Sequence, residues 1–288
     1  MSIRTKSKKK RQSLAFNIVG VIFLLYAISL LTPLLWGIWN SFLTRAEYNM
    51  ASAVIKVPSA FRFDNYVNAW QELSANGVSM VTMTLNSLWY AAGSTALVLF
   101  ANTMTAYVCE KYEFVGAGFF KKFQWITMSI PIMGNMAASL RWFRTLHVYD
   151  SYLYIIGTVG GLGFMFIFMS STFRGLSWQY AEAAFMDGAG HFRVFFQVML
   201  PQVLPTITAL FVSEFITRWN DSMTPLVFFP NLPTLASGLY VYQTIASRAI
   251  NYPMLFAALV MCMIPVLVLY MFFQDTLMDL QLGGGVKG

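Results

Sequence analysis

The sequence Glu182-Ala183-Ala184, followed after three residues by Gly188 and after nine more by Val198-Met199-Leu200-Pro201, lies between two apolar segments of membrane-spanning length. Around it, residues 178–187 combine alanines with aromatic side chains, a mixture that favours a short helix docked closely against another surface. Gly188 ends that helix, because glycine adopts the backbone angles of a helix terminus at little cost. Residues 174–200 are therefore predicted to form a polar loop that carries a docking helix.

The composition is that of a membrane protein. Of the 288 residues, 57% are hydrophobic and 11% are charged, against roughly 25% charged in soluble domains. The apolar residues occur in runs that can cross a bilayer, not in the amphipathic periods of soluble helices. Cys109, Cys262, His147 and His191 show no disulfide or metal-ligand spacing. The sequence predicts one polytopic membrane domain without a metal or cofactor.

Six apolar segments are long enough to span a membrane, since a spanning helix needs about 20 residues. They are residues 14–42, 73–109, 123–140, 151–173, 201–219 and 251–274. The third is the shortest and contains Pro131, which predicts a kink. We therefore expect an all-α polytopic membrane protein with a basic N-terminus (1–13), a domain of six transmembrane helices (14–282), outer loops at 44–79 and 221–251, and a C-terminal tail (283–288).

Lysine and arginine decide the orientation. If the N-terminus is cytoplasmic, the cytoplasmic segments 1–13, 110–122, 174–200 and 283–288 hold 12 of the 19 basic residues. Because cytoplasmic loops carry the excess of positive charge, this orientation is favoured, with both termini inside. The basic run at residues 6–11 adjoins the first apolar segment, so we interpret it as an anchor attracted to anionic lipid and not as a nucleic-acid patch. The loop at 174–200 is then predicted to lie in the cytoplasm.

The spacing within residues 182–201 resembles the cytoplasmic coupling loop of permease subunits in binding-protein-dependent ABC importers, with Val198 where that family usually has isoleucine. An amphipathic helix at the membrane surface is the alternative, but it does not require Leu200-Pro201 at that distance. The tail Gly285-Val286-Lys287-Gly288 further resembles the shorter partner of the permease pair in the maltose-type carbohydrate branch. Weaker matches to that branch are Pro58, Phe61, Asn65, Tyr66, Asn86, Ser87, Ala106, Tyr107, Asp187, Ala189, Trp219, Asn220 and Pro225.

The resemblance implies the type I ABC importer permease fold, in a multi-pass subunit of the bacterial cytoplasmic membrane. It implies a second permease that shares the translocation path as a heterodimer, two copies of an ATPase subunit and an extracytoplasmic solute-binding protein. The chain has no phosphate-binding Gly-x-x-x-x-Gly-Lys-Ser/Thr sequence, so ATP and Mg²⁺ are expected on the ATPase, and this subunit is not expected to be an enzyme. The expected solute is a sugar or oligosaccharide; a permease for peptides, amino acids or phosphate, and a secondary transporter, are the alternatives.

The resemblance also places the contact with the ATPase on Tyr180, Glu182, Ala183, Ala184, Phe185, Asp187, Gly188, Leu200 and Pro201. In this set, Ala183 and Ala184 would permit close approach. Glu182 would accept charge-assisted hydrogen bonds from a basic side chain of the ATPase. The alternative for Glu182 is compensation of the dipole in the first turn of its own helix.

Polar residues in or near the apolar segments are candidates for the translocation path, because an unpaired polar group in lipid is costly. They are Asn86, Asn102, Asn135, Ser139, Glu214 and Asn220. Hydrogen bonds between helices are the alternative for the amides and the serine. For Glu214, the alternative is an ion pair with Arg218, one helical turn further on.

The outer loop at 221–251 contains three prolines and is expected to face the solute-binding protein. We expect Phe228, Phe229 and Asn231 to be exposed there and to contact that protein, since aromatic side chains often contribute much of the energy of an interface. The alternative is a loop that packs over the closed permease.

Overall fold

The computed structural model describes residues 2–50, 57–129, 134–160, 163–245 and 250–283, and it is mostly helical. Pro131 and the tail at 284–288 lie outside the described residues. The chain forms two compact units, one from Met1–Gln71 with Ser247–Met261 and one from Glu72–Ala246 with Cys262–Gly288.

The first unit contains the long helix α1 (Ser2–Asn40), the short helix α2 (Arg45–Asn49), most of α3 (Asp64–Glu72) and the first part of α16 (Tyr252–Gly283). The stretch Phe16–Asn40 of α1 is apolar and long enough to cross a membrane, and the predicted segment 14–42 coincides with it. Large apolar side chains on every side of this stretch are exposed in the isolated chain. Such a surface suits a helix surrounded by lipid or by other apolar helices.

Helix α2 begins with a reciprocal cap. The Thr44 side chain accepts a hydrogen bond from the backbone N–H of Glu47, and the Glu47 carboxylate accepts one from the backbone N–H of Thr44 at 2.7 Å. The hydroxyl and the backbone N–H of Ser59 also donate to Glu47. These donors favour the ionised carboxylate, with the Ser59 hydroxyl contributing most, and lower the pKa of Glu47 from 4.5 to about 2.

Hydrogen bonds and aromatic pairs fold the first outer segment back onto the end of α1. The Asn65 side chain, on α3, donates to the backbone carbonyls of Ser41 and Leu43 at 2.7 and 2.8 Å. On α2, Tyr48 stacks on Tyr252 of α16 with ring centroids 5.1 Å apart. Within the predicted loop at 44–79, residues 44–50 and 57–72 are thus partly helical and held by specific contacts.

The second unit is built on a continuous helical stretch, Met80–Lys111, composed of α4 (Met80–Leu88), a π-helical turn η1 (Trp89–Gly93) and α5 (Ser94–Lys111). The predicted segment 73–109 was wrong at its start. Residues Ser74–Ala75 (β1) and Val78–Ser79 (β2) form a small antiparallel hairpin around Asn76-Gly77. Both turn residues have positive φ, +53° and +78°, as the two-residue hairpin turn requires.

The third and fourth predicted segments are not single helices in the described residues. The third is represented by α6 (Ala117–Ser129) and α7 (Met136–Thr145). The fourth is represented by α8 (Tyr154–Gly157), a 3₁₀ turn η2 (Thr158–Gly160) and α9 (Phe164–Gly175). Gly134, at φ +77°, precedes α7, and Gly163 caps α9. Glycines at these positions permit backbone angles that interrupt a helix.

The fifth predicted segment is bent. The helical stretch His191–Gln202, made of α11 (His191–Val194), a π-helical turn η3 (Phe195–Met199) and α12 (Leu200–Gln202), meets α13 (Leu204–Trp219) at 74°. Pro205 lies in the first turn of α13, where proline is tolerated but cannot continue the preceding hydrogen-bond ladder.

Three described helices are long and apolar enough to cross a membrane, or four if the bent pair counts as one span: Phe16–Asn40, Met80–Lys111, Tyr252–Asp275 and His191–Trp219. The predicted count of six spans is therefore not confirmed by length and composition alone. The predicted outer loop at 221–251 also contains helices, α14 (Met223–Phe228) and α15 (Leu235–Ile245).

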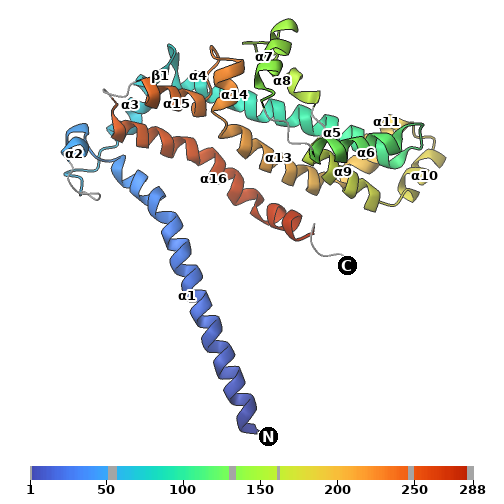
Figure 1. Ribbon diagram of the computed structural model, residues 1–288, viewed down its shortest axis with the longest axis horizontal. Coiled ribbons are helices and arrows are strands. Elements are labelled where there is room, and N and C mark those ends of the chain that lie inside the picture. Colours follow the sequence, from blue (N-terminus) through green and yellow to red (C-terminus); the bar gives the residue numbers. More distant parts are fainter. Residues whose placement is uncertain (1, 51–56, 130–133, 161–162, 246–249, 284–288) are drawn as a thin grey trace. The chain divides into compact units, whose positions relative to one another are not determined.

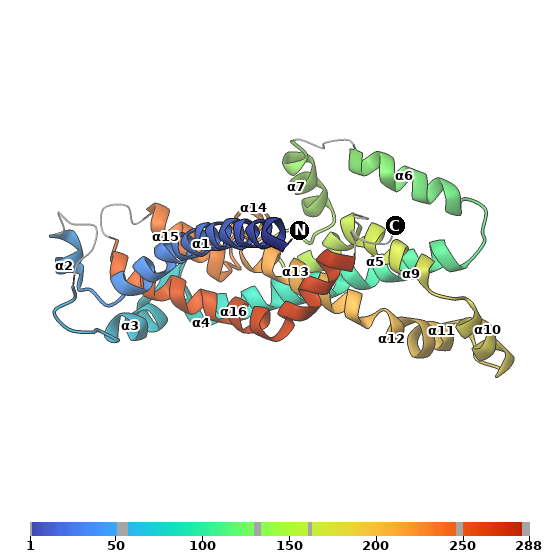
Figure 2. The ribbon, with the colours of Figure 1, turned by 90° about the horizontal axis from the view of Figure 1, so that it is seen from below.

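The core of the second unit lies between α5 and the helices beside it. In Figure 1, α5 runs alongside α9 and α13, with which it makes contacts. Helix α10 (Gln179–Met186) and α11 lie at one end of this unit, beyond α12 (Figure 2). At the other end, α15 packs on α4, where a Cβ at Gly238 would collide with the Met83 sulfur. This arrangement places the 174–200 segment and residues 221–245 at opposite ends of α4 and α5.

Candidate functional site

The docking helix predicted at 178–187 is α10, Gln179–Met186. It ends in a Schellman motif, in which Gly188 N–H donates to Phe185 O and Ala189 N–H donates to Ala184 O, both at 3.0 Å. Gly188 has φ +79°, a left-handed conformation that side chains with a Cβ rarely adopt. The predicted helix end at Gly188 is confirmed.

Helix α10 has two different faces. Ala181 is fully buried, and Ala184 and Phe185 pack against the same apolar cluster of α5, α9 and η3. Tyr180 and Met186, by contrast, are 55% and 88% exposed. Ala184 and Phe185 are half-buried because the helical repeat turns them towards this cluster, and their contact with the ATPase stays a prediction.

Glu182 lies on the exposed face, together with Ala183 and Asp187. Among the described residues, no hydrogen bond or ion pair is formed by the Glu182 carboxylate. It stands in the first turn of α10, where a carboxylate also compensates the helix dipole. The side chain is therefore placed to meet a partner, while its contribution to the dipole stays open.

The downstream part of the motif has a structural role in the described chain. Leu200 packs against the apolar cluster beneath α10, and the exposed Pro201 lies in the first turn of α12. Proline fits there, because the first N–H groups of a helix have no intrahelical acceptor. The Leu-Pro pair thus marks the return from the loop into the bent fifth segment.

The end of α5 contacts the chain just before and just after α10. Lys111 Nζ donates to the Leu176 carbonyl at 2.6 Å, just before α10. The Tyr112 hydroxyl is 2.9 Å from His191 Nδ1, just after α10. Trp178 and Phe185 pack on the same rings, with Trp178 5.7 Å from Tyr112 between ring centroids. These contacts attach both ends of α10 to the end of α5.

A buried carboxylate reinforces this attachment, and the sequence reasoning missed it. The Glu110 side chain is 4% exposed and pairs with Lys121 Nζ of α6 at 2.8 Å and with Arg174 of α9 at 3.2 Å. It also accepts a hydrogen bond from the Ser170 hydroxyl. The position of Glu110 directly after the apolar segment 73–109 was a signal that the sequence offered. Its partners could not be found in the same way, because they lie 11, 60 and 64 residues further along the chain.

At the opposite end of the unit, Phe228 and Phe229 are not exposed. They are 7% and 0% exposed and pack in an aromatic cluster with Tyr90, Phe143 and Tyr154. The expectation that Phe228 and Phe229 are exposed was wrong, because packing in this cluster is favoured by the removal of their apolar surface from water. The alternative that this segment packs over the permease fits the structure.

Asn231 is exposed, as predicted, but its polar atoms are already engaged. Its backbone N–H and its side-chain amide donate to the Asp150 carboxylate at 3.0 and 2.5 Å. The backbone N–H of Asp150 donates in turn to the Phe228 carbonyl at 2.8 Å. These three bonds fasten the 147–153 loop to the 228–231 segment.

Four of the candidate path residues do not gather at one place. Asn86 is 3% exposed and bridges elements, donating to the Pro233 carbonyl at 3.0 Å and accepting from the Tyr152 hydroxyl at 3.3 Å. Asn220 is exposed and donates to Ile216 O within its own helix. Asn135 is exposed before α7, and Ser139 is half-buried. Asn86 thus has the role of a hydrogen bond between elements.

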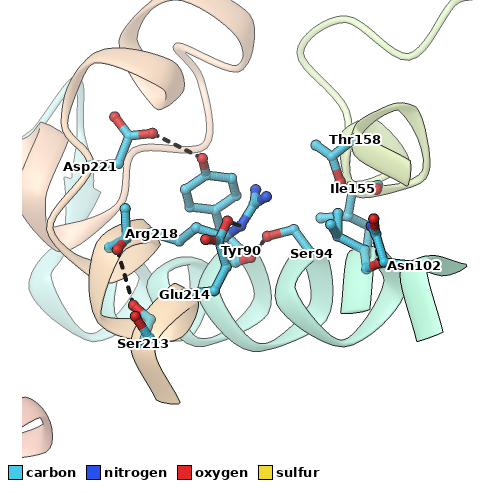
Figure 3. A network of polar contacts seen from close by, with 11 residues as sticks. Tyr90, Ser94, Asn102, Ile155, Thr158, Ser213, Glu214, Arg218 and Asp221 are labelled. Carbon is cyan, nitrogen blue, oxygen red and sulfur yellow. Dashed lines mark hydrogen bonds and ion pairs between the residues drawn. The ribbon is translucent and has the colours of Figure 1, made fainter. Parts of the chain in front are cut away.

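The other two, Asn102 and Glu214, line one pocket of about 260 Å³ between α5, η2, α9 and α13. Arg218 lines it too, and its Nε donates to Glu214 Oε1 at 2.8 Å, so the ion pair that was the alternative for Glu214 is present. Beside the pair, the Tyr90 hydroxyl donates to Asp221 at 3.0 Å (Figure 3). Among the described residues, no group of three acidic, histidine or cysteine side chains could hold a metal ion.

Residues 12–278 match the family described as the inner membrane component of binding-protein-dependent transport systems. The chain belongs to this family. The resemblance to permeases of binding-protein-dependent importers is thus confirmed by a match over nearly the whole chain. Its place is the membrane, as the apolar helices also indicate.

Relatives of this inner membrane component carry names from carbohydrate transport. A diacetylchitobiose uptake system permease protein of Streptomyces coelicolor is 30% identical over 258 residues, which cover 88% of this chain and 83% of that protein. An arabinooligosaccharides transport system permease protein of Halalkalibacterium halodurans is 27% identical over 285 residues, covering 98% of this chain and all of that protein.

The same fold occurs in a solved structure. A bacterial ABC transporter involved in the import of the acidic polysaccharide alginate contains a chain that superposes with a TM-score of 0.77 at 22% identity, covering 92% of this chain and 97% of that one. At this identity the likeness concerns the fold. It agrees with the mostly helical inner membrane component described above.

Proposed function

We propose that this chain is the transmembrane permease subunit of an ATP-driven importer for a sugar or an oligosaccharide. The match to the transport family over residues 12–278 and the carbohydrate permeases among its relatives support this role. A solute of another class, such as a peptide, an amino acid or phosphate, is the alternative.

The observation that carries the proposal is the outward face of α10. A short helix, closed by Gly188 and attached to the end of α5 by Lys111 and Tyr112, displays the unpaired carboxylate of Glu182 and the side chain of Tyr180. This arrangement suits a coupling helix that binds an ATPase and moves together with a membrane-spanning helix as a rigid body.

The remaining parts of the assembly follow from this role. We propose a second permease that completes a heterodimer, two ATPase subunits that bind ATP and Mg²⁺, and an extracytoplasmic solute-binding protein. The chain itself would contribute no catalytic group. Six spans with both termini in the cytoplasm, a domain at 14–282 and a cytoplasmic tail at 283–288 complete the proposal, which the positive charge of residues 1–13 and 110–122 supports.

The test is reconstitution of the complete complex in proteoliposomes with its solute-binding protein. Wild type should take up labelled oligosaccharide only with ATP and the binding protein. Glu182→Gln should weaken association with the ATPase about fivefold, because the hydrogen bond to the basic partner loses the negative charge of its acceptor, a difference of about 1 kcal/mol.

Glu113→Gln is the matched control, since Glu113 is also an exposed carboxylate beyond the end of α5 but lies outside α10. Equal coupling in both variants would refute the role of α10. Absence of ATP-dependent uptake of any saccharide by the intact complex would refute the sugar importer.

A further inference from the structure

The pocket lined by Asn102, Glu214 and Arg218 combines polar and apolar walls. The other residues that line it are Val98, Thr158, Gly163, Phe164, Met165, Leu210 and Ser213. Its polar groups come from three different elements, α5, η2 and α13, which are distant in the sequence. A mixed lining of this kind is characteristic of sites that orient a small organic ligand.

Arg218 has unused hydrogen-bonding capacity in this pocket. A guanidinium carries five N–H groups, and in the described part of the chain Arg218 donates only from Nε, to Glu214. Its side chain is 16% exposed, so the charge is not extended into bulk solvent. A charged residue within a membrane domain usually faces a wet cavity and marks a solute path.

The guanidinium is held in position from two sides. Glu214 fixes Nε at 2.8 Å, and the Tyr90 ring lies beneath, with its centroid 5.9 Å from Arg218 Cζ. Tyr90 is itself held by the hydrogen bond from its hydroxyl to Asp221. In Figure 3 the Arg218 guanidinium lies between Tyr90 and the side of the pocket that holds Thr158 and Asn102. The free amino groups are thus preorganised, which lowers the entropic cost of binding.

The size and charge of the pocket restrict its ligand. At about 260 Å³, it is slightly below the roughly 300–1,000 Å³ of ordinary ligand sites, so it suits a single ring and not a whole oligosaccharide. Among its described lining residues, the charged side chains are Glu214 and Arg218, and their charges balance. Phe164 and Leu210 offer apolar surface to C–H groups, while Arg218 donates to oxygen atoms.

We propose that this pocket holds one uncharged sugar ring of the solute during its passage, with Arg218 donating to ring or hydroxyl oxygens and Glu214 setting the preference for neutral over acidic sugars. This inference rests on the proposed importer function and adds the place and the charge of the solute contact.

Cysteine labelling tests where the sugar lies. Ser213 and Thr217 are both exposed hydroxyl residues of α13, but only Ser213 lines the pocket. In a complex carrying Cys109→Ala and Cys262→Ala, Ser213→Cys and Thr217→Cys would each be labelled with a methanethiosulfonate reagent. The probes are diacetylchitobiose and an arabinotriose, presented on the binding protein. At a probe concentration about ten times its Kd, labelling of Ser213→Cys should slow roughly tenfold, because only the free fraction reacts. Labelling of Thr217→Cys should not change.

Removal of one charge tests the preference for neutral over acidic sugars. Glu214→Gln leaves the Arg218 charge unbalanced, so stimulation of ATP hydrolysis by a uronate trisaccharide should rise relative to the neutral probes. Asp64→Asn, which removes the carboxylate of an exposed ion pair with Arg62 in the outer segment, should leave this ratio unchanged.

The outcomes of these experiments distinguish the sugar-pocket proposal from the importer proposal. A complex that imports a neutral sugar, yet shows equal labelling of Ser213→Cys with and without it, overturns the pocket alone. An unchanged ratio in Glu214→Gln overturns the role of the ion pair. A wild-type complex that responds to its binding protein but moves neither probe nor any other saccharide overturns the importer proposal itself.

Discussion

Replacing Gly188 with alanine should loosen the end of α10 without disturbing its packing. Gly188 has φ +79°, and a Cβ there would meet nothing within 4 Å, so the cost is backbone strain and not a collision. A residue with a Cβ in this left-handed conformation costs about 1–2 kcal/mol, which corresponds to roughly a fivefold to thirtyfold larger population of the frayed helix end. The two Schellman hydrogen bonds from Gly188 and Ala189 would be lost together in that state.

Gly190 provides the matched control two residues away. It has φ −77° and ψ 163°, which alanine adopts readily, and it too has open space around it. Gly190→Ala should therefore add no backbone strain, and its small cost falls on α11, whose N-cap is Gly190, and not on the end of α10. Gly188→Asn should recover much of the loss, because asparagine tolerates the left-handed region.

The measurement is amide hydrogen exchange of the peptide that covers residues 187–189 in the reconstituted complex, followed by the affinity for the ATPase. We expect faster exchange and weaker ATPase binding in Gly188→Ala only. If Gly188→Ala and Gly190→Ala behave alike, the strain argument is wrong. If exchange rises without any loss of ATPase affinity, the geometry is right but α10 is not the coupling helix.

Two further predictions concern the carboxylates of Glu110 and Glu47. Glu110→Gln should lower the thermal stability of the permease, because the positive charges of Lys121 and Arg174 lose the negative charge that they share. Arg174→Gln should cost less, about 0–1 kcal/mol, since the Arg174 side chain is 69% exposed. Equal losses in differential scanning fluorimetry would contradict this order. Hydrogen bonds from Ser59 and Thr44 lower the pKa of Glu47 to about 2. The stability that the ionised Glu47 contributes is therefore complete above pH 4.5 and is lost as the pH falls towards 2. Infrared titration, compared with Glu47→Gln, should show one carboxyl that protonates near pH 2, whereas a midpoint near 4.5 would refute the cap.

Local physical rules account for the features that the sequence alone predicted correctly. The helix end at Gly188 follows from the backbone freedom of one residue, and the pairing of Glu214 with Arg218 follows from the four-residue repeat of a helix. The long apolar stretches of α1 and α16 follow from hydropathy over about 20 residues. Each of these signals is contained within a few turns of the chain.

Predictions failed where a local signal competed with a turn or with distant contacts. The apolar run at 73–109 gave no warning that Asn76-Gly77 would fold its first residues into a hairpin. The motif could not show that Ala184 and Phe185 face the core, because that depends on which side of α10 meets α5 and η3. An apolar outer segment was likewise open to two interpretations, and its aromatic rings are buried.

By itself, the sequence determined that this is a helical membrane protein with a short helix, closed by Gly188, between two apolar segments, because hydropathy and glycine placement act over short distances. Only the tertiary structure decided which polar residues meet. Asn102 and Glu214 lie 112 positions apart and share a pocket, and Glu110 joins α5 to both α6 and α9. Such pairings depend on how helices pack, and helix packing follows from the shapes of whole surfaces, which no single segment of the chain specifies.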